Sequence, residues 1–141
     1  MLEIRNLEKR FGKTVAAAGV SLTLEDGCTA ALLGPNGSGK TTLMKMIAGL
    51  TKPDSGSIRM AGCPIGPLSK KQVCYMPTER YFYNWMSAQD AGRYYADFFE
   101  DFSPIRYDEL LSKEDIDPKR KLRSLSSGMV AKVKRKLGAK A

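Results

Sequence analysis

The sequence contains no histidine and only three cysteines among its 141 residues. The cysteines, Cys28, Cys63 and Cys74, form no C-x-x-C pair, so their spacing disfavours a metal site. Their odd number also argues against a framework of disulfide bonds. We therefore expect buried thiols, as in proteins of the reducing cytosol.

Long apolar runs are also missing. No uncharged apolar run approaches the roughly 18 residues that would indicate a membrane-spanning helix. The first five residues lack the apolar core of a signal peptide, and no internal repeat or low-complexity segment is present. The 43% apolar and 27% charged residues are typical of a soluble globular protein, and the length suits one domain.

A formal net charge of +8 could indicate a partner that is nucleic acid or anionic lipid. The cations are dispersed, however, except for Lys119 to Lys121 with Arg123 and the tail from Lys132 to Lys136. Aromatic residues that could stack on bases are sparse near both clusters. We favour a solvated face, in which the tail complements the dipole at the end of a last helix.

The most informative stretch is Gly34 to Thr42, which fits G-x-x-x-x-G-K-[ST]. It follows the apolar run Ala30 to Leu33 and precedes a helix-forming run, the context in which this pattern indicates a phosphate-binding loop. Glycines let backbone N–H groups turn inward, and the helix start favours anions. A Gly-rich turn that matches by chance is the alternative, which this context disfavours. The candidate nucleotide-binding residues are Gly34, Asn36, Gly37, Ser38, Gly39, Lys40, Thr41 and Thr42.

Within this loop, Lys40 would reach the β- and γ-phosphates of a nucleotide. The Thr41 hydroxyl would hold Mg²⁺. The sequence therefore predicts that the loop binds the phosphates of a nucleotide with Mg²⁺.

Apolar periodicity predicts the elements around the loop. Alternation indicates strands at 2–7 and 20–24, and a short strand holds Ile58 and Met60. Continuous apolar runs indicate a strand at 28–33, covered on both faces, and another at 73–76. A helix after the loop would pack on the sheet and be capped by Gly49. Its apolar residues are Leu43, Met44, Ile47 and Leu50.

The second half reads as helical. An aromatic cluster at 81–86 precedes Ser87 and Asp90, whose spacing predicts a helix N-cap. A short helix is expected at 107–111, and a last helix opens at Leu125 to Met129. The strand, phosphate loop and helix in succession indicate an α/β fold.

Three features together resemble the nucleotide-binding subunit of ATP-binding cassette (ABC) transporters, from Met1 to about Lys136. The loop Gly34 to Thr42 resembles the family's Walker A motif. Phe11 lies where the family places an aromatic residue that stacks on adenine, although a lone aromatic also fits a core position. Leu125 to Met129 resembles the signature LSGGQ, with Ser third and Met fifth.

The resemblance implies a P-loop NTPase cassette that uses ATP and Mg²⁺. Ser126, Ser127 and Gly128 would close over ATP held by a second nucleotide-binding subunit in a head-to-tail dimer. A transmembrane permease would be the other partner, which places the chain in the cytoplasm at the inner face of the cell membrane. The expected parts are a nucleotide-binding core at 1–79, a helical subdomain at 80–127 that docks on the permease, and the signature helix at 128–141. Residues 81–86 are the candidate contact patch for the permease, and a buried core cluster is the alternative.

The sequence departs from the family pattern at two places. Thr78 stands where the family has a Gln that touches Mg²⁺, so Thr78 is a second candidate metal ligand, with Glu79 as a substitute. The apolar strand ending in Asp-Glu (Walker B) and the later His are not found before Ala141. We therefore expect an incomplete cassette, in which the C-terminal catalytic strands are missing and residues 28–33 have an unpaired side.

Since hydrolysis needs metal placement, an oriented water and charge stabilisation together, we assign no catalytic residue. The expected function is ATP binding in a transporter, and the signature is similar to that of bacterial exporters. One alternative is a binding-only or inert remnant. Another is a soluble ABC protein acting on RNA or DNA, which only the basic charge supports.

Overall fold

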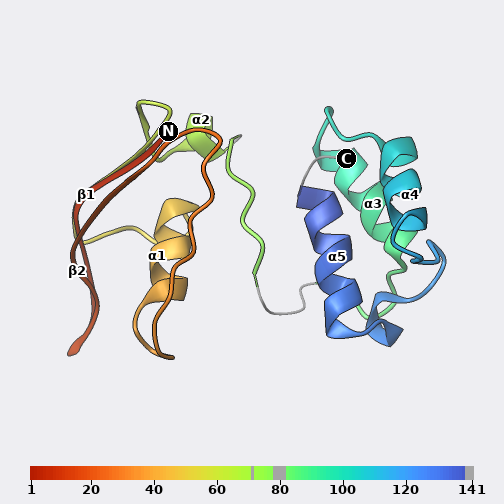
Figure 1. Cartoon of the computed structure of the whole chain (residues 1–141), viewed down its shortest axis with the longest axis horizontal. Helices are drawn as coiled ribbons and strands as arrows, with labels where there is room; N and C mark the ends of the chain where they lie inside the picture. The colour runs from red at the N-terminus through yellow and green to blue at the C-terminus, as the bar shows by residue number, and fades with distance from the viewer. Residues whose placement is uncertain (71, 78–81, 139–141) are drawn as a thin grey trace. The chain divides into compact units, whose positions relative to one another are not determined.

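A computed structural model describes residues 1–70, 72–77 and 82–138 of the chain (Figure 1). The chain divides into two compact units, Met1–Tyr75 and Met76–Ala141. Unit 1 holds the strands and the phosphate-loop motif, and unit 2 holds the helices that include the signature. Each unit is described by itself.

The sheet of unit 1 has four antiparallel strands in the order β2-β1-β3-β4. Their bounds are β1 (Leu2–Phe11), β2 (Thr14–Leu24), β3 (Ser55–Met60) and β4 (Cys63–Pro64). A tight turn at Gly12, with φ 57°, joins β1 to β2. The strands expected at 2–7 and 20–24 and around Ile58 are confirmed, and the first hairpin is longer than its alternation indicates.

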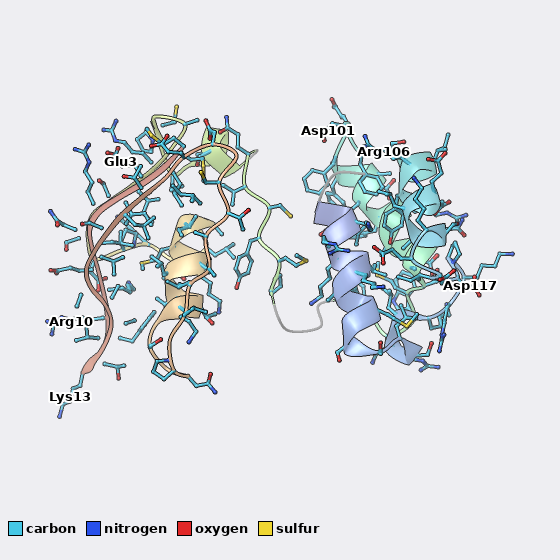
Figure 2. All side chains as sticks on the ribbon, in the orientation of Figure 1. Glu3, Arg10, Lys13, Asp101, Arg106 and Asp117 are labelled. Carbon is cyan, nitrogen blue, oxygen red and sulfur yellow. The ribbon has the colours of Figure 1, made fainter. Side chains whose placement is uncertain are left out.

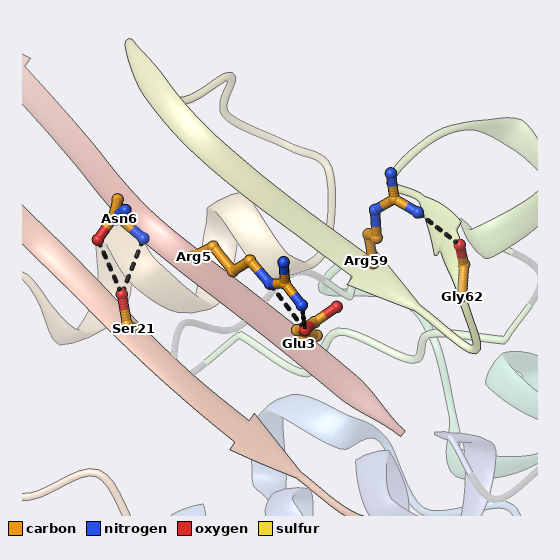
Figure 3. A network of polar contacts seen from close by, with 6 residues as sticks. All are labelled: Glu3, Arg5, Asn6, Ser21, Arg59 and Gly62. Atoms are coloured by element: carbon orange, nitrogen blue, oxygen red, sulfur yellow. Dashed lines mark hydrogen bonds and ion pairs between the residues drawn. The ribbon is translucent and has the colours of Figure 1, made fainter.

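β1 carries a bulge at Asn6, where the register with both neighbours shifts. Asn6 has φ 46°, and its N–H donates to Ser21 Oγ at 2.8 Å (Figure 3). Opposite the bulge, a Cβ on Gly56 would lie 2.3 Å from the Asn6 carbonyl oxygen, so only glycine fits there. This close approach places the start of β3 beside Glu8 of β1.

The helix after the phosphate loop, α1 (Lys40–Ile47), packs on this sheet through Leu43 and Met46. At its end Gly49 has φ 67°, and the Leu50 N–H donates to the Lys45 carbonyl at 2.8 Å. This pattern is a glycine C-cap and confirms the expected helix end. The expected apolar face is wrong in part, because Met44 and Leu50 are 43% and 59% exposed. Leu43 and Met46 lie three positions apart and therefore on one face of α1, which is the face that packs on the sheet. Met44 lies outside this face.

Two expected strands are not present in the described part of the chain. Residues 28–33 pair with none of β1 to β4, and all six are exposed, with Leu33 88% exposed. Residues 73–76 likewise form no strand there. A strand forms only against a partner, and the sheet here places all four strands elsewhere. After β4 the chain forms the short helix α2 (Pro67–Lys70).

Unit 2 is built from helices with a 3₁₀ turn before the last one. Their bounds are α3 (Ala88–Phe98), α4 (Pro104–Ser112), η1 (Leu122–Ser124) and α5 (Ser127–Gly138). The expected cap of α3 is confirmed as a capping box. The Asp90 N–H donates to Ser87 Oγ at 3.1 Å, and the Ser87 N–H donates to Asp90 Oδ2 at 2.8 Å. The short helix expected at 107–111 lies within α4.

Tyr107 of α4 lies in the core of unit 2, where it is 1% exposed. Its hydroxyl donates to the Ala88 carbonyl at 2.9 Å, and burial raises the pKa of the phenol. A Cβ on Gly92 would lie 2.6 Å from two carbons of the Tyr107 ring. The ring therefore fills the space that the missing side chain leaves on α3.

The basic tail is a solvated face only in part, because Lys132 and Arg135 are exposed whereas Lys134 is buried. Lys132, Arg135 and Lys136 of α5 all pair with Glu114, at 2.8, 3.1 and 3.2 Å. Hydrogen bonds from Lys132 and Lys136 lower the pKa of Glu114 to about 2. Lys134 is buried and donates to the Pro77 carbonyl at 2.8 Å. Three of the cations thus connect α5 to Glu114, just after α4, and Arg135 and Lys136 lie in the last turn of α5, as expected for cations that complement the helix dipole.

The expectation of buried thiols is also wrong, because Cys28, Cys63 and Cys74 are all exposed. Cys28 lies in the unpaired stretch before the phosphate loop, and Cys63 lies in a strand of two residues. Thr78 and Glu79 lie outside the described residues.

Candidate functional site

Three glycines shape the loop that leads from the exposed stretch 28–33 into α1. Gly34, Gly37 and Gly39 have φ values of 155°, 82° and 87°. A turn closed by the Ser38 N–H on the Pro35 carbonyl, at 3.3 Å, lies between them. Since side-chain-bearing residues rarely adopt such φ values, the glycines allow the loop to curl in front of the helix.

Lys40, the first residue of α1, reaches back over this loop. Its ammonium donates to the Gly34 carbonyl at 2.7 Å, the Pro35 carbonyl at 2.6 Å and Ser38 Oγ at 3.3 Å. The ammonium thus lies against the loop backbone, with carbonyl and hydroxyl oxygens as its acceptors. Phosphate oxygens are stronger acceptors of the same kind, so a bound phosphate would compete for this ammonium.

The first turn of α1 leaves its positive dipole end available. It consists of Lys40, two threonines and Leu43, with no acidic residue. Thr41 is exposed and Thr42 is half-buried, so the Thr41 hydroxyl is accessible for a ligand. An N-terminus with N–H groups and a lysine but no carboxylate favours an anion.

β2 supports the loop from one side. A Cβ built on Gly39 would lie 1.9 Å from the Ala16 carbonyl oxygen, so the two backbones touch. Ala16 is two residues from Thr14, which corresponds to about 7 Å along the strand. Thr14 pairs with Phe11 across the hairpin. The phosphate loop and Phe11 are therefore connected by one short piece of β2.

Phe11 is at the end of β1 and is 53% exposed, so it is not a core residue. The Lys9 ammonium lies 5.3 Å from the centroid of its ring. In Figure 1 the tip of the β1–β2 hairpin and the loop before α1 lie at the same end of unit 1, and Lys13 marks this tip in Figure 2. The structure thus leaves an accessible ring at the end where the loop lies.

The signature residues are at the start of α5 in unit 2. Ser126 caps this helix, because the Met129 N–H donates to its Oγ at 3.3 Å. Ser127 and Gly128 are exposed, and a Cβ on Gly128 would meet no described atom within 4 Å. The cap confirms the helix start expected from the sequence, and the first turn of α5 is accessible.

A comparison with models of known protein families identifies the family of this chain. The model described as ABC transporter matches residues 17–134. The chain belongs to the ABC transporter family. Its glycine-shaped loop is accordingly the Walker A loop of an ATP-binding cassette.

Individual relatives agree with this assignment. The ABC transporter ATP-binding protein YtrB of Bacillus subtilis (strain 168) is 34% identical over 131 residues, which are 92% of this chain and 45% of YtrB. A solved ABC transporter ATP-binding protein from Pyrococcus furiosus is 30% identical with a TM-score of 0.83, covering 96% of this chain and 68% of that one. The chain thus spans less than half the length of YtrB.

A third comparison concerns the fold alone. A solved ATP-binding cassette in a dimeric post-hydrolysis state, bound to ADP and Pi, has a TM-score of 0.76 at 18% identity. The match covers 98% of this chain and 68% of that chain. The cassette fold therefore extends over nearly all of the chain.

Near Phe11 the cassette has a polar contact that the sequence did not reveal. Asp54 Oδ1 accepts from Lys9 at 2.7 Å, and Asp54 Oδ2 accepts from the Arg10 N–H at 2.7 Å. These hydrogen bonds lower the pKa of Asp54, and the bond from Lys9 has the largest effect. Asp54 reads only as a turn residue because its partners lie 44 and 45 positions earlier in the chain.

The described part of the cassette holds no cluster of three or more His, Cys, Asp or Glu side chains that could bind a metal by themselves. Thr41 is the described candidate for Mg²⁺, and Thr78 lies outside the described residues. No helix within the described ranges is long and apolar enough to cross a membrane.

Proposed function

We propose that this chain binds ATP with Mg²⁺ through Gly34 to Thr42, as the nucleotide-binding subunit of an ABC transporter. The observation that carries the proposal is the Lys40 ammonium, which lies 2.6–2.7 Å from two carbonyls of a loop curled by positive-φ glycines. The Lys40 ammonium would exchange its hydrogen bonds to these carbonyls for hydrogen bonds to the β- and γ-phosphates. Backbone N–H groups at the start of α1 would bind the same phosphates. The solved relative with ADP and Pi supports this choice of ligand.

The Thr41 hydroxyl would hold Mg²⁺, which would neutralise part of the phosphate charge. The exposed Thr41 in the first turn of α1 supports this role, since a threonine after the loop lysine is the usual protein ligand in such sites. Thr78 remains a second candidate from the sequence. The base would stack on the accessible ring of Phe11.

A second nucleotide-binding subunit would complete the site. Ser126, Ser127 and Gly128 lie at an accessible helix start whose first turn consists of uncharged residues. Such a start suits the phosphates of ATP held by another subunit. The dimeric state of the related solved cassette supports a pair of subunits, and we propose that the two are arranged head to tail.

A transmembrane permease is the other proposed partner, and it would hold the chain at the inner face of the cell membrane. Two aromatic residues in unit 2 support a contact there. Tyr83 and Trp85 are 62% and 61% exposed and stack with centroids 5.9 Å apart. Met86, from the same expected patch, is buried and belongs to the core. The proposed contact thus narrows to Tyr83 and Trp85 among the described residues. ATP binding and hydrolysis would drive transport in the whole transporter.

Titration calorimetry with Mg-ATP tests the proposed binding directly. Lys40→Ala removes charged hydrogen bonds to phosphate and is expected to weaken binding by about 10-fold to 100-fold. Lys45→Ala, an exposed lysine in the last turn of the same helix, is the matched control and should bind as the unchanged chain does. Equal affinities for the Lys40 and Lys45 variants would contradict the proposal.

A further inference from the structure

Three contacts converge on Asp54, the residue just before β3. Its carboxylate accepts from the Lys9 ammonium at 2.7 Å and from the Arg10 N–H at 2.7 Å. Its own N–H donates to the Glu8 carbonyl at 3.0 Å. Asp54 therefore binds three consecutive residues of β1, and these residues immediately precede Phe11 and its neighbour Gly12.

We call these three hydrogen bonds the Asp54 clamp. It lies beyond the end of β3, where no other strand of the described residues borders that side of β1. The last pair between β1 and β3 is Glu8 with Ser55. Beyond it β1 pairs only with β2, up to Phe11 and Thr14. The Asp54 side chain continues the hydrogen bonding on the β3 side by reaching the Arg10 N–H. Without it the end of β1 would be a two-stranded ribbon, which is marginally stable in water.

Lys9 connects Asp54 to the aromatic ring of Phe11. Its side chain is 14% exposed, so it is enclosed for most of its length. The same ammonium that pairs with Asp54 lies 5.3 Å from the centroid of the Phe11 ring. A cation at this distance is attracted by the ring face. Asp54, Lys9 and Phe11 thus form one chain of contacts from the start of β3 to the exposed ring.

We propose that Asp54 is a positioning residue for the nucleotide base. Asp54 holds the Lys9 ammonium and the Arg10 N–H, and it thereby fixes the Phe11 ring in the orientation in which the base can stack on it. This inference rests on the proposed function, since it concerns the same nucleotide. Asp54 would not touch the nucleotide, and its effect would pass entirely through Phe11.

We expect Asp54 to strengthen nucleotide binding because it orders the Phe11 ring before the ligand binds. A ring that is already fixed loses less side-chain freedom when a base stacks on it. Releasing Lys9 from Asp54 should therefore weaken binding of the base and leave binding of the phosphates unchanged. For an exposed cation–π contact we expect a change of about threefold in affinity.

Two variants and one control test the proposal on the full chain. Asp54→Asn removes the charge but keeps an oxygen that can accept from the Arg10 N–H. Lys9→Met removes the cation and keeps a side chain of similar length, so it serves if Asp54→Asn lowers the stability of the sheet. Glu3→Gln is the matched control, because Glu3 also pairs with a cation of β1, Arg5, but lies near the other end of that strand.

Affinity is measured for Mg-ATP and for magnesium tripolyphosphate, which has the phosphates but no base. Asp54→Asn and Lys9→Met should bind ATP about threefold more weakly and bind tripolyphosphate unchanged. In a Phe11→Ala background, Asp54→Asn should have no further effect. Glu3→Gln should match the unchanged chain with both probes.

Other results overturn the inference in distinguishable ways. Equal weakening of both probes would mean that Asp54 acts on the fold and not on the base. A loss that persists in the Phe11→Ala background would mean that Asp54 does not act through Phe11. If Asp54→Asn behaves as Glu3→Gln while the unchanged chain binds ATP, only the inference fails. If the unchanged chain binds neither probe, the proposed function fails with it.

Discussion

Replacing Gly39 with alanine should destabilise unit 1 more than the same replacement at Gly37. Both glycines have left-handed backbones, with φ 87° and 82°. An alanine in that conformation costs about 1–2 kcal/mol at either position. At Gly37 nothing more is added, because a Cβ there would meet no described atom within 4 Å.

At Gly39 the new Cβ would lie 1.9 Å from the Ala16 carbonyl oxygen, a backbone atom that cannot rotate away. Moving α1 away from β2 to relieve this clash costs about 1–3 kcal/mol more, by analogy with overpacked cores. The total for Gly39→Ala is then about 2–5 kcal/mol. Such a loss is a large fraction of the stability of an ordinary domain.

Urea unfolding followed by far-ultraviolet circular dichroism measures both losses. The unfolding slopes of the variants should agree, so that the midpoints report the free energy of unfolding. Exchange of the Leu43 amide, which donates to the Gly39 carbonyl at 2.9 Å, reports the same loss at the start of α1. Equal destabilisation by Gly37→Ala and Gly39→Ala would refute the close approach of α1 and β2.

Two further predictions concern unit 2. Glu114→Gln should lower the stability at pH 7. Because the pKa of Glu114 falls from its usual 4.5 to about 2, this difference is present above pH 4.5 and disappears as the pH falls towards 2 in acid titrations of unfolding. A difference that persists at pH 2 would contradict this pairing. Tyr107→Phe removes the hydroxyl that donates to the Ala88 carbonyl and should cost about 1 kcal/mol in urea unfolding. Tyr94→Phe, an exposed tyrosine of α3, is the control, and an equal loss there would count against the buried hydrogen bond.

The parts of the fold that local chemistry determines could be predicted from the sequence. The glycines of the Walker A loop have the backbone angles that the motif requires. Ser87 and Ser126 cap the helices that their positions indicate. Each of these features depends on residues that lie close together in the sequence, so a single short stretch contains all the information.

The parts that depend on distant residues could not be predicted. The apolar run at 28–33 reads as a buried strand, but the sheet provides no partner for it in the described part of the chain. Asp54 reads as a turn residue, and its partners Lys9 and Arg10 are more than 40 positions away. The sequence around Glu114 likewise does not indicate that this residue forms ion pairs with three cations of α5.

The most direct test of nucleotide binding is to follow backbone amide signals by nuclear magnetic resonance while Mg-ATP is added to the full chain. The largest shifts should fall on the N–H groups from Gly34 to Thr42, with smaller shifts near Phe11. Unit 1 also has a separate pocket of about 420 Å³, lined by residues that include Met46, Ile58 and Ile65. Shifts centred on that pocket, or no shifts at all, would contradict the assignment of the phosphate loop as the nucleotide site.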